Sequence, residues 1–348
     1  MSLAIVTGAR GWLGTRLTQT LIQGVPDVGA LGPSDRPVRC LVLPGDDPGE
    51  LDTIASSVSV VRGDVTNPES LAPLFADARG ATVFHCAGVI HPARGTKEFF
   101  SVNVEGTRNV VNAAVKAGVR RLVHVSSNSP LGTNPSAEHV FDESAPYRPY
   151  MTYGKTKMLA EELVNEAGAK GQLEISIIRP PWFYGPWQPP RQTVFFTMIR
   201  NGKGPLVGDG KNRRSMAYVD NICQGALLCE KSERAKGQTY WIADRRPYPM
   251  LEILDTVADV LQKDFGLACR GGYLRLPSFA ADVARLVDAT LQSVGLYHQK
   301  IHVLSEMNQT IACSIARAEA ELGYDPKVDL REGMRRSIQW LIERGVTP

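Results

Sequence analysis

The sequence predicts an α/β fold: a doubly wound parallel sheet with helices on both faces and a smaller C-terminal lobe. Three observations lead to this prediction. Short apolar runs alternate with amphipathic helical stretches over the first half of the chain, a glycine-rich turn joins the first run to the first helical stretch, and aromatic and proline-rich segments begin at Trp182. Strands that alternate with helices are typical of parallel sheets, in which a helix connects each strand to the next.

Six apolar runs of strand length define the expected sheet. These strands are Leu3–Thr7, Val38–Leu43, Val58–Val61, Ala81–Cys86, Leu122–Ser126 and Ile175–Arg179. Helical periodicity is found between them at Leu13–Gln23, Pro68–Ala76 and Val104–Ala117. We therefore expect a first domain over residues 1–180, built around one parallel sheet.

The pattern changes after residue 180. Helical periodicity continues at Met250–Leu261, Phe279–Val294 and Leu330–Ile342, which predicts a substrate-binding lobe over residues 181–348. A helix at Val219–Cys229 and a strand at Thr239–Ala243 indicate that residues 215–245 return to the main sheet. The two parts are thus expected to interleave.

The composition excludes several classes of protein. A chain of 348 residues with 43% apolar content can bury a full core. Its net charge of +3 comes from scattered Lys and Arg residues, so we expect a small-molecule substrate and no nucleic-acid partner. The chain shows no signal peptide, no transmembrane segment and no cysteine spacing typical of a metal site, and its six dispersed cysteines indicate a reducing cytoplasmic location.

A glycine-rich turn, Thr7-Gly-Ala-Arg-Gly-Trp-Leu-Gly14, follows the first strand and opens the first helix. Glycines at such a position allow a tight turn, and they let backbone N–H groups approach a pyrophosphate at the positive end of the helix dipole. This context predicts a Rossmann-type dinucleotide site. The residues expected to contact the cofactor there are Gly8, Arg10, Gly11, Trp12, Leu13 and Gly14.

The choice between NAD and NADP depends on the end of the second strand, where NAD sites usually have a carboxylate. Leu43 holds that position, Asp35 precedes the strand, and Asp46 and Asp47 lie beyond it. Arg10 could instead bind a 2′-phosphate, because a guanidinium matches phosphate geometry. The cofactor is therefore NAD(P), with NADP(H) favoured by Arg10; the alternative is that Arg10 is simply solvated.

Tyr153 and Lys157 lie four residues apart in a helical stretch and so share one face of the helix. A phenol is a poor base at pH 7, and a nearby ammonium group favours its ionised form. Ser127 ends the fifth strand at the carboxyl edge of the sheet, where it can polarise a substrate oxygen. We expect these three residues to be catalytic, with Ser126 and Ser129 as alternatives to Ser127.

These motifs, in this order, resemble the extended short-chain dehydrogenase/reductase family. Further matching segments are Gly63-Asp-Val65, His85-Cys-Ala-Gly88, Asn103-Val-Glu-Gly-Thr107, Arg179-Pro-Pro-Trp-Phe-Tyr-Gly185 and Tyr218-Val-Asp220. The resemblance implies a second set of cofactor-site residues: Asp64 and Val65 beside adenine, Ala87 and Gly88 along the groove, Asn103 as a support, and Pro180 and Phe183 at the nicotinamide. Taken alone, Asp64 could be a turn residue and Asn103 a helix cap.

Two branches of this family compete for the substrate. Arg214 follows a Gly-Asp-Gly turn and, with Arg191, resembles the diphosphate-binding arginines of nucleotide-sugar epimerases and dehydratases. The aromatic cluster that includes Trp182 resembles equally well the branch of 3β-hydroxysteroid dehydrogenases and dihydroflavonol-type reductases, which take flat apolar ligands. Ser129 is a further candidate for contact with the substrate. Asn128 and Ser129 stand where dehydratases usually have acidic residues, which disfavours dehydration.

We therefore expect hydride transfer at a secondary alcohol or ketone of a small apolar or aromatic substrate. The first alternative is a nucleotide-sugar 4-epimerase or dehydratase, and a more remote one is a non-catalytic dinucleotide sensor. The resemblance also implies a homodimer, in which helices Val104–Ala117 and Tyr153–Ala167 form the interface, with a monomer as the alternative.

Overall fold

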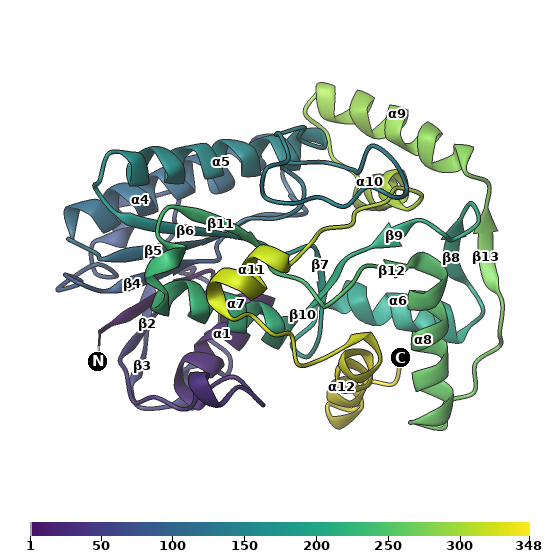
Figure 1. Cartoon of the computed structure of the whole chain (residues 1–348), viewed down its shortest axis with the longest axis horizontal. Helices are drawn as coiled ribbons and strands as arrows, with labels where there is room; N and C mark the ends of the chain where they lie inside the picture. Colours follow the sequence, from purple (N-terminus) through teal and green to yellow (C-terminus); the bar gives the residue numbers. More distant parts are fainter. Residues whose placement is uncertain (1) are drawn as a thin grey trace.

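The computed structural model describes residues 2–348 and has the predicted α/β architecture (Figure 1). Along the chain, its elements are β1 (Ala4–Thr7), α1 (Trp12–Gln23), η1 (Gly29–Leu31), β2 (Val38–Val42), α2 (Leu51–Ile54), β3 (Val58–Arg62), η2 (Pro68–Leu71), β4 (Thr82–His85), α3 (Lys97–Phe99), η3 (Phe100–Glu105), α4 (Gly106–Lys116), β5 (Arg121–Val125), α5 (Met151–Ala169), β6 (Glu174–Arg179), β7 (Trp182–Tyr184), α6 (Pro190–Arg200), β8 (Gly204–Val207), β9 (Arg213–Arg214), β10 (Met216–Tyr218), α7 (Val219–Lys231), η4 (Glu233–Ala235), β11 (Gln238–Trp241), β12 (Tyr248–Pro249), α8 (Met250–Lys263), β13 (Tyr273–Leu276), α9 (Phe279–Ser293), α10 (Gln299–Glu306), α11 (Ala316–Leu322) and α12 (Leu330–Glu343).

The central sheet has seven strands in the order β11-β6-β5-β4-β1-β2-β3, and every pair is parallel. The strand order reverses between β1 and β4, which pair with each other in the middle of the sheet. In open parallel sheets, ligands bind outside the carboxyl ends of the strands at this reversal point. The predicted fold class is confirmed, and the topology itself places a ligand site beside the end of β1.

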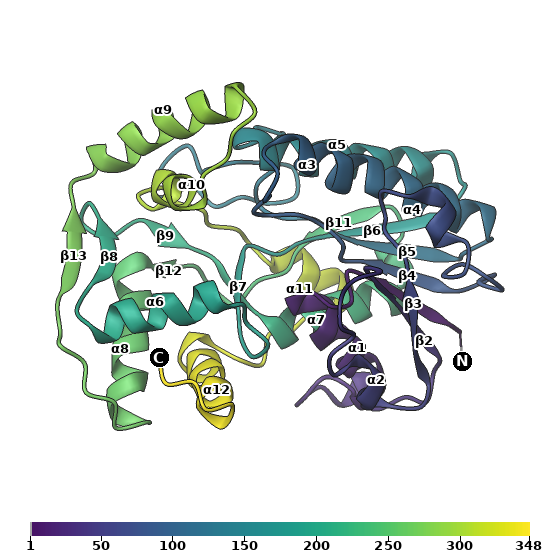
Figure 2. The same cartoon turned by 180° about the vertical axis from the view of Figure 1, so that it is seen from behind.

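The inner strands of the sheet bury side chains on both of their faces, as the continuous apolar runs predict, whereas the edge strand β3 has no fully buried residue. Val6 belongs to a core under α1 and α7, whereas its neighbour Ile5 belongs to a second core under α4 and α5. Figures 1 and 2 show these two helical layers on opposite sides of the sheet. Because the side chains alternate along a strand, a single apolar run supplies both cores.

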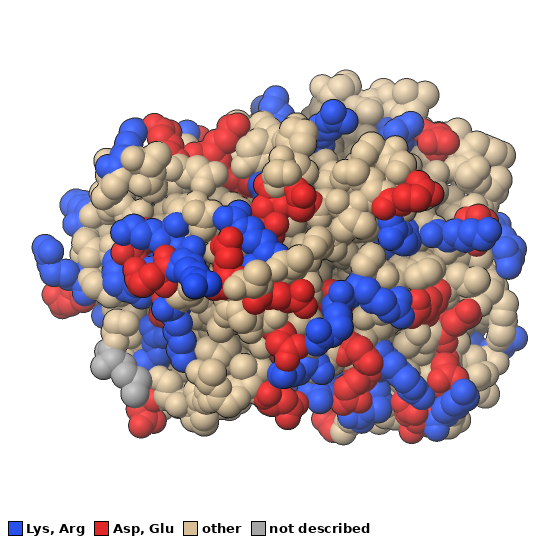
Figure 3. Space-filling model, viewed as in Figure 1, with Lys and Arg blue, Asp and Glu red and all other residues tan. Residues whose placement is uncertain are grey.

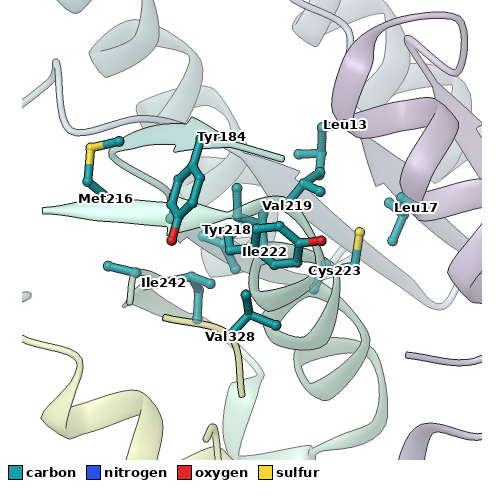
Figure 4. Packing of buried hydrophobic residues seen from close by; sticks show 14 of the residues in the cluster. Leu13, Leu17, Tyr184, Met216, Tyr218, Val219, Ile222, Cys223, Ile242 and Val328 are labelled. Atoms are coloured by element: carbon teal, nitrogen blue, oxygen red, sulfur yellow. The ribbon is translucent and has the colours of Figure 1, made fainter. Parts of the chain in front are cut away.

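The junction between the sheet and the lobe is also tightly packed. Tyr184 on β7 and Tyr218 on β10 lie among Leu13 and Ile222 (Figure 4). The carboxylate of Asp244 accepts hydrogen bonds from the Tyr184 hydroxyl at 2.8 Å and from the Tyr218 N–H at 2.9 Å. Burial raises the pKa of Asp244 to about 7. The parallel pair β7–β10 is thereby attached to the segment that follows β11.

The predicted helix at Pro68–Ala76 is wrong, because only Pro68–Leu71 is helical, as a single 3-10 turn. Asn67 caps this turn by accepting a hydrogen bond from the Glu69 N–H. The chain then turns at Asp77, with a φ of +52°, to enter β4. Residues 72–77 form turns in place of the expected helix.

The helix predicted from Val104 begins earlier than its apolar periodicity suggested. Lys97–Phe99 is α-helical, and Phe100–Glu105 is a π-helical segment that continues directly into α4. Such wide turns are rare and often lie at functional sites. Here the wide turn contains Asn103, whose side chain holds the loop after β4.

The lobe contains elements that periodicity did not reveal. Helices α6, α10 and α11 and the two-stranded pairs β8–β13 and β9–β12 were not predicted. Their strands have only two to four residues, which is too few for an alternating pattern. No helix within residues 2–348 is long and apolar enough to cross a bilayer. The division of the chain at residue 180 stays a prediction.

Candidate active site

The glycine turn connects β1 to α1 at the point where the strand order reverses. Gly8 has a φ of +67°, and a Cβ atom there would lie 2.7 Å from the Ala87 backbone nitrogen. A Cβ atom on Gly14 would collide with the Gly8 carbonyl oxygen. The N–H of Gly11 donates to the Gly8 carbonyl at 2.9 Å and closes the turn. The N-terminus of α1 is therefore open to a pyrophosphate, as a dinucleotide requires.

Trp12 joins this turn to the predicted nicotinamide segment. Its indole N–H donates to the Pro186 carbonyl at 2.6 Å, and its ring lies 4.7 Å from that of Phe183. Leu13 is buried beneath the turn, and Pro180 is buried at the end of β6. The structure thus brings the first glycines together with a loop more than 170 residues away.

Two arginines lie at the end of β2, where a second-strand carboxylate is absent. Leu43 is 48% exposed at this position. Arg10 donates through Nε to the Asp47 carbonyl at 2.8 Å, and Arg62 donates to the carbonyls of Leu43 and Asp46. Sequence reasoning missed Arg62, because nothing in its local pattern distinguishes it from an exposed strand-end residue.

Asp64 and Val65 follow β3 on the same side of the sheet. One carboxylate oxygen of Asp64 accepts the Thr66 N–H at 2.8 Å, which is the turn role considered as an alternative. Val65 is buried, and its carbonyl accepts from Asn109 at 2.9 Å. Contact of these residues with adenine stays a prediction.

Asn103 holds the loop that begins with Ala87 and Gly88. Its amide oxygen accepts the Val89 N–H at 2.8 Å, and its amide nitrogen donates to the Val89 carbonyl at 3.0 Å and to Thr156 on α5 at 3.2 Å. Asn103 is therefore a link between this loop and the catalytic helix, rather than a helix cap.

Tyr153 and Lys157 lie on one face of α5, as their spacing predicts, and Ser127 follows β5 beside them. Burial raises the pKa of Tyr153 to about 12, although a hydrogen bond with Ser127 partly offsets this effect. The Ser127 hydroxyl lies 3.3 Å from that of Ser129, whereas the Ser126 hydroxyl is buried without a partner. The structure therefore favours Ser127 over Ser126 as the partner of the phenol.

Lys157 is buried against the carboxyl ends of the central strands. Its ammonium donates to the Val125 carbonyl at 2.8 Å and lies 3.4 Å from Nε2 of His124. Burial lowers the pKa of Lys157 to about 8. Burial and the nearby Lys157 charge also keep His124 neutral, because both lower its pKa. Because the pKa of Lys157 lies close to neutral pH, a charge placed beside this side chain readily changes its protonation state.

Aromatic side chains from the first domain and from the lobe lie beside Tyr153. The ring of Phe99 lies 5.9 Å from that of Tyr153 and 5.5 Å from that of Tyr297. The Tyr297 hydroxyl lies 2.6 Å from Nδ1 of His91, and its ring lies 5.5 Å from that of His302. We call Phe99, His91, Tyr297 and His302 the aromatic cover. Sequence reasoning missed all four, since they come from two segments, 91–99 and 297–302, that lie far apart in the sequence.

The two candidate arginines border the aromatic cover. Arg214 is 8% exposed, donates to the Glu306 carbonyl at 2.7 Å and leaves its Nε without a partner. Burial lowers the pKa of His91 to about 4, and the positive charge of the nearby Arg191 contributes to this decrease. Within residues 2–348 neither arginine has a carboxylate within 4.0 Å. Trp182 packs instead on Phe195, with their ring centroids 5.6 Å apart.

A sequence model of the NAD dependent epimerase/dehydratase family matches residues 4–243, more than half of the chain. The chain belongs to this family. The matched range contains the glycine turn, Ser127, Tyr153 and Lys157, whereas Tyr297 and His302 of the aromatic cover lie beyond it. The resemblance drawn from the sequence motifs is confirmed.

Relatives of this epimerase/dehydratase-family enzyme match nearly its whole length. The protein y4nL of Sinorhizobium fredii is 49% identical over 99% of this chain and 96% of its own. A 3-beta-hydroxysteroid dehydrogenase of Mycolicibacterium neoaurum is 30% identical over 97% of this chain and 90% of its own. A dTDP-glucose 4,6-dehydratase of Streptomyces venezuelae, solved with NAD, superimposes with a TM-score of 0.76 at 26% identity, over 99% of this chain and 98% of its own. The chain is therefore an NAD(P)-dependent enzyme of the extended short-chain dehydrogenase/reductase type.

A buried ion pair in the lobe of this family member gives a prediction for its stability. His302 donates to Asp288 at 2.7 Å, and both side chains are buried. Burial lowers the pKa of His302, but the bond to Asp288 and the charge of Glu306 outweigh it, so that the net pKa is raised. The stabilising charge is fully present below the unfolded pKa of about 6.5 and is lost as the pH rises through the folded pKa.

We expect the stability difference between the wild type and His302→Gln to be largest at low pH and to shrink as the pH rises. Urea unfolding at a series of pH values measures this difference. The exposed His298, replaced by Asn to keep its helix-capping role, is the control and should follow the wild-type profile. A pH-independent difference for His302→Gln would show that the histidine is neutral in the folded protein.

Proposed function

We propose that this enzyme transfers a hydride between a nicotinamide and a secondary alcohol or ketone of a small, mainly apolar or aromatic substrate. The observation that carries the proposal is the aromatic cover, since the Phe99 ring lies 5.9 Å from that of Tyr153 and also contacts the Tyr297 ring. Flat apolar ligands favour surroundings of this kind. The 30% identity to a 3-beta-hydroxysteroid dehydrogenase supports the same substrate class.

Each catalytic residue has a role that follows from its surroundings. A dinucleotide fits the glycine turn, because Gly8 and Gly14 let the backbone pack where a Cβ atom would collide with it, and no side chain caps the N-terminus of α1. The bound nicotinamide supplies the hydride. In the reductive direction Tyr153, held protonated by burial, donates a proton to the carbonyl oxygen, and Ser127 donates a hydrogen bond to the same oxygen. Lys157 stabilises the phenolate that remains.

We further propose NADP(H) as the preferred cofactor. Arg10 and Arg62 both lie along the loop after β2, and Leu43 stands where NAD sites usually have a carboxylate. Guanidiniums suit a 2′-phosphate. Fluorescence titration with NADPH and NADH tests this choice. Tighter binding of NADPH that Arg62→Gln abolishes would support it, whereas tighter binding of NADH would assign the enzyme to NAD.

The runner-up is a nucleotide-sugar 4-epimerase or dehydratase. One observation favours it: Arg214 is buried without a carboxylate partner, and an anionic substrate could supply that partner. Within this alternative, dehydration is the weaker reading, because Asn128 and Ser129 follow Ser127 in place of acidic residues. A non-catalytic dinucleotide sensor is disfavoured, since Tyr153 and Lys157 are both present and paired on one helix face.

Turnover assays separate these candidates. Purified enzyme with NADPH or NADH is incubated with steroid and aromatic ketones and, separately, with UDP- and dTDP-sugars. We expect turnover of apolar ketones only. Turnover of nucleotide sugars, lost by about 100-fold in Arg214→Met, would instead establish the runner-up, because a buried guanidinium–phosphate contact is worth several kcal/mol. Cofactor binding without any turnover would favour the sensor.

The cellular setting completes the proposal. We propose a cytoplasmic enzyme with a small-molecule substrate and no nucleic-acid partner, assembled as a homodimer through α4 and α5. These two helices pack side by side and form an outer layer of the molecule (Figures 1 and 2). Analytical ultracentrifugation determines the oligomeric state directly.

A further inference from the structure

Helix α9 buries one face and exposes large apolar side chains on the opposite face. Its inner face, which includes Ala281, Ala284 and Asp288, is buried against the rest of the lobe. On the outer side the large apolar side chains are exposed, and each lies three, four or seven residues from another, which places them on one helix face. They are Phe279 (65% exposed), Val283 (56%), Leu286 (71%) and Val287 (40%), followed directly after the helix by Val294 (69%). We call these five residues the α9 ridge.

The ridge projects outward from the molecule. Helix α9 lies along one edge in both views, with no other element beyond it (Figures 1 and 2). The surface over α9 carries few charged side chains (Figure 3). The charges of the helix itself, Asp282 and Arg285, pair with each other at 3.4 Å on one flank and leave the ridge uninterrupted. A solvated helix face is normally polar, so this pattern requires a partner.

Unpaired cations flank the ridge in sequence. Arg275 precedes α9 on β13, and Lys300 follows it on α10, which packs against α9. Both are exposed, and within the described residues 2–348 neither has a carboxylate within 4.0 Å. The Arg275 guanidinium lies over the Tyr273 ring instead. Apolar side chains bordered by free cations match the interface of a bilayer that contains anionic lipids.

The size of the ridge argues against a second copy of the chain as its partner. Its five side chains expose on the order of 500 Å², about the size of the largest, often functional, apolar patch on a monomer but less than the ~800 Å² that each partner buries in a stable dimer. A second copy would also have to match the shape of the ridge to bury it well. A lipid surface needs no such complementary shape, because it deforms around the side chains.

We propose that the α9 ridge docks the enzyme onto an anionic lipid surface. This inference goes beyond the proposed function, and the docking itself does not depend on it. The inner side of the same helix reaches the active site, because Gln292 accepts the N–H of Thr152, next to Tyr153, at 3.0 Å. If the substrate is apolar as proposed, docking would place the aromatic cover next to the phase in which such a substrate is concentrated.

Vesicle flotation tests the docking without any need for turnover. Wild-type protein is mixed with vesicles of phosphatidylcholine alone or with added phosphatidylglycerol, and we expect flotation mainly with the anionic vesicles. Phe279→Ser/Leu286→Ser should lower the vesicle-bound fraction by at least about tenfold. The matched control is Val194→Ser/Val346→Ser, two exposed apolar residues outside the ridge, and it should bind as the wild type does.

A second variant tests the charges. Arg275→Gln/Lys300→Gln, which keeps the ridge intact, should lose most of the preference for anionic vesicles, about fivefold for each cation removed. Circular dichroism melts confirm that each variant is folded. The proposal is overturned if the wild type binds neither kind of vesicle or if the ridge variant binds as well as the wild type. It is equally overturned if ultracentrifugation shows a wild-type dimer that the ridge variant dissociates, since a second copy would then cover α9.

Discussion

Tyr153→Phe is expected to lower kcat by about 100- to 10,000-fold while the cofactor Kd remains nearly unchanged. The reason is that only the hydroxyl is lost. The ring of Phe at this position still packs on Phe99, so the aromatic cover is kept. Without the hydroxyl, no group on α5 can give a proton to a substrate oxygen, because burial and the Val125 carbonyl hold Lys157 further inside.

Steady-state kinetics and a cofactor titration on the same preparation measure the two quantities. Tyr240→Phe is a suitable control, because it removes a phenol hydroxyl that donates to Glu321 far from the sheet's carboxyl edge. It should leave kcat and the cofactor Kd near the wild-type values. Unchanged turnover in Tyr153→Phe would exclude the phenol as proton donor and would require another group, with His91 next to be tested.

The parts of the site that the sequence predicts are those with a local signature. The glycine turn is recognisable because its function needs residues without a Cβ atom. A Cβ atom at position 14, for example, would collide with the Gly8 carbonyl oxygen. Tyr153 and Lys157 are recognisable because a spacing of four places them on one helix face. Ser127 follows from the end of a buried strand. Each of these inferences uses only a few consecutive residues.

The aromatic cover could not be predicted in this way. Phe99 and Tyr297 meet although almost 200 residues separate them, and neither lies in a motif. Similarly, Arg62 becomes interesting only when its guanidinium is seen along the loop that contains Asp46. The helix predicted at Pro68–Ala76 failed for the opposite reason, since a local apolar pattern was present but the chain forms turns after Leu71. Tertiary contacts decide these positions, and a single sequence does not display them.

The ion pair between Arg179 and Glu161 gives the largest expected effect on stability. Arg179 ends β6, and its Nε and Nη2 atoms lie 3.0 and 2.5 Å from the two oxygens of Glu161 on α5. The Tyr147 hydroxyl donates to the same carboxylate at 2.7 Å. Burial alone would lower the pKa of Arg179, yet the bond to Glu161 raises it. Both side chains are almost fully buried, so each charge depends on the other.

Removing one member of the pair should therefore cost more than removing both. Arg179→Met leaves the Glu161 carboxylate buried without its partner and is expected to lower the free energy of unfolding by about 3–5 kcal/mol. Arg179→Met/Glu161→Leu should recover most of this loss, because two apolar side chains replace two desolvated charges.

Lys170→Met, in an exposed pair on the same helix, is the control and should have almost no effect. Urea unfolding of the four proteins measures the series. If the double variant were as unstable as Arg179→Met, the loss would arise from packing around β6 and not from the unpaired charge. Because Glu161 lies one helical turn beyond Lys157, the same pair also fixes the face of α5 that carries the catalytic residues.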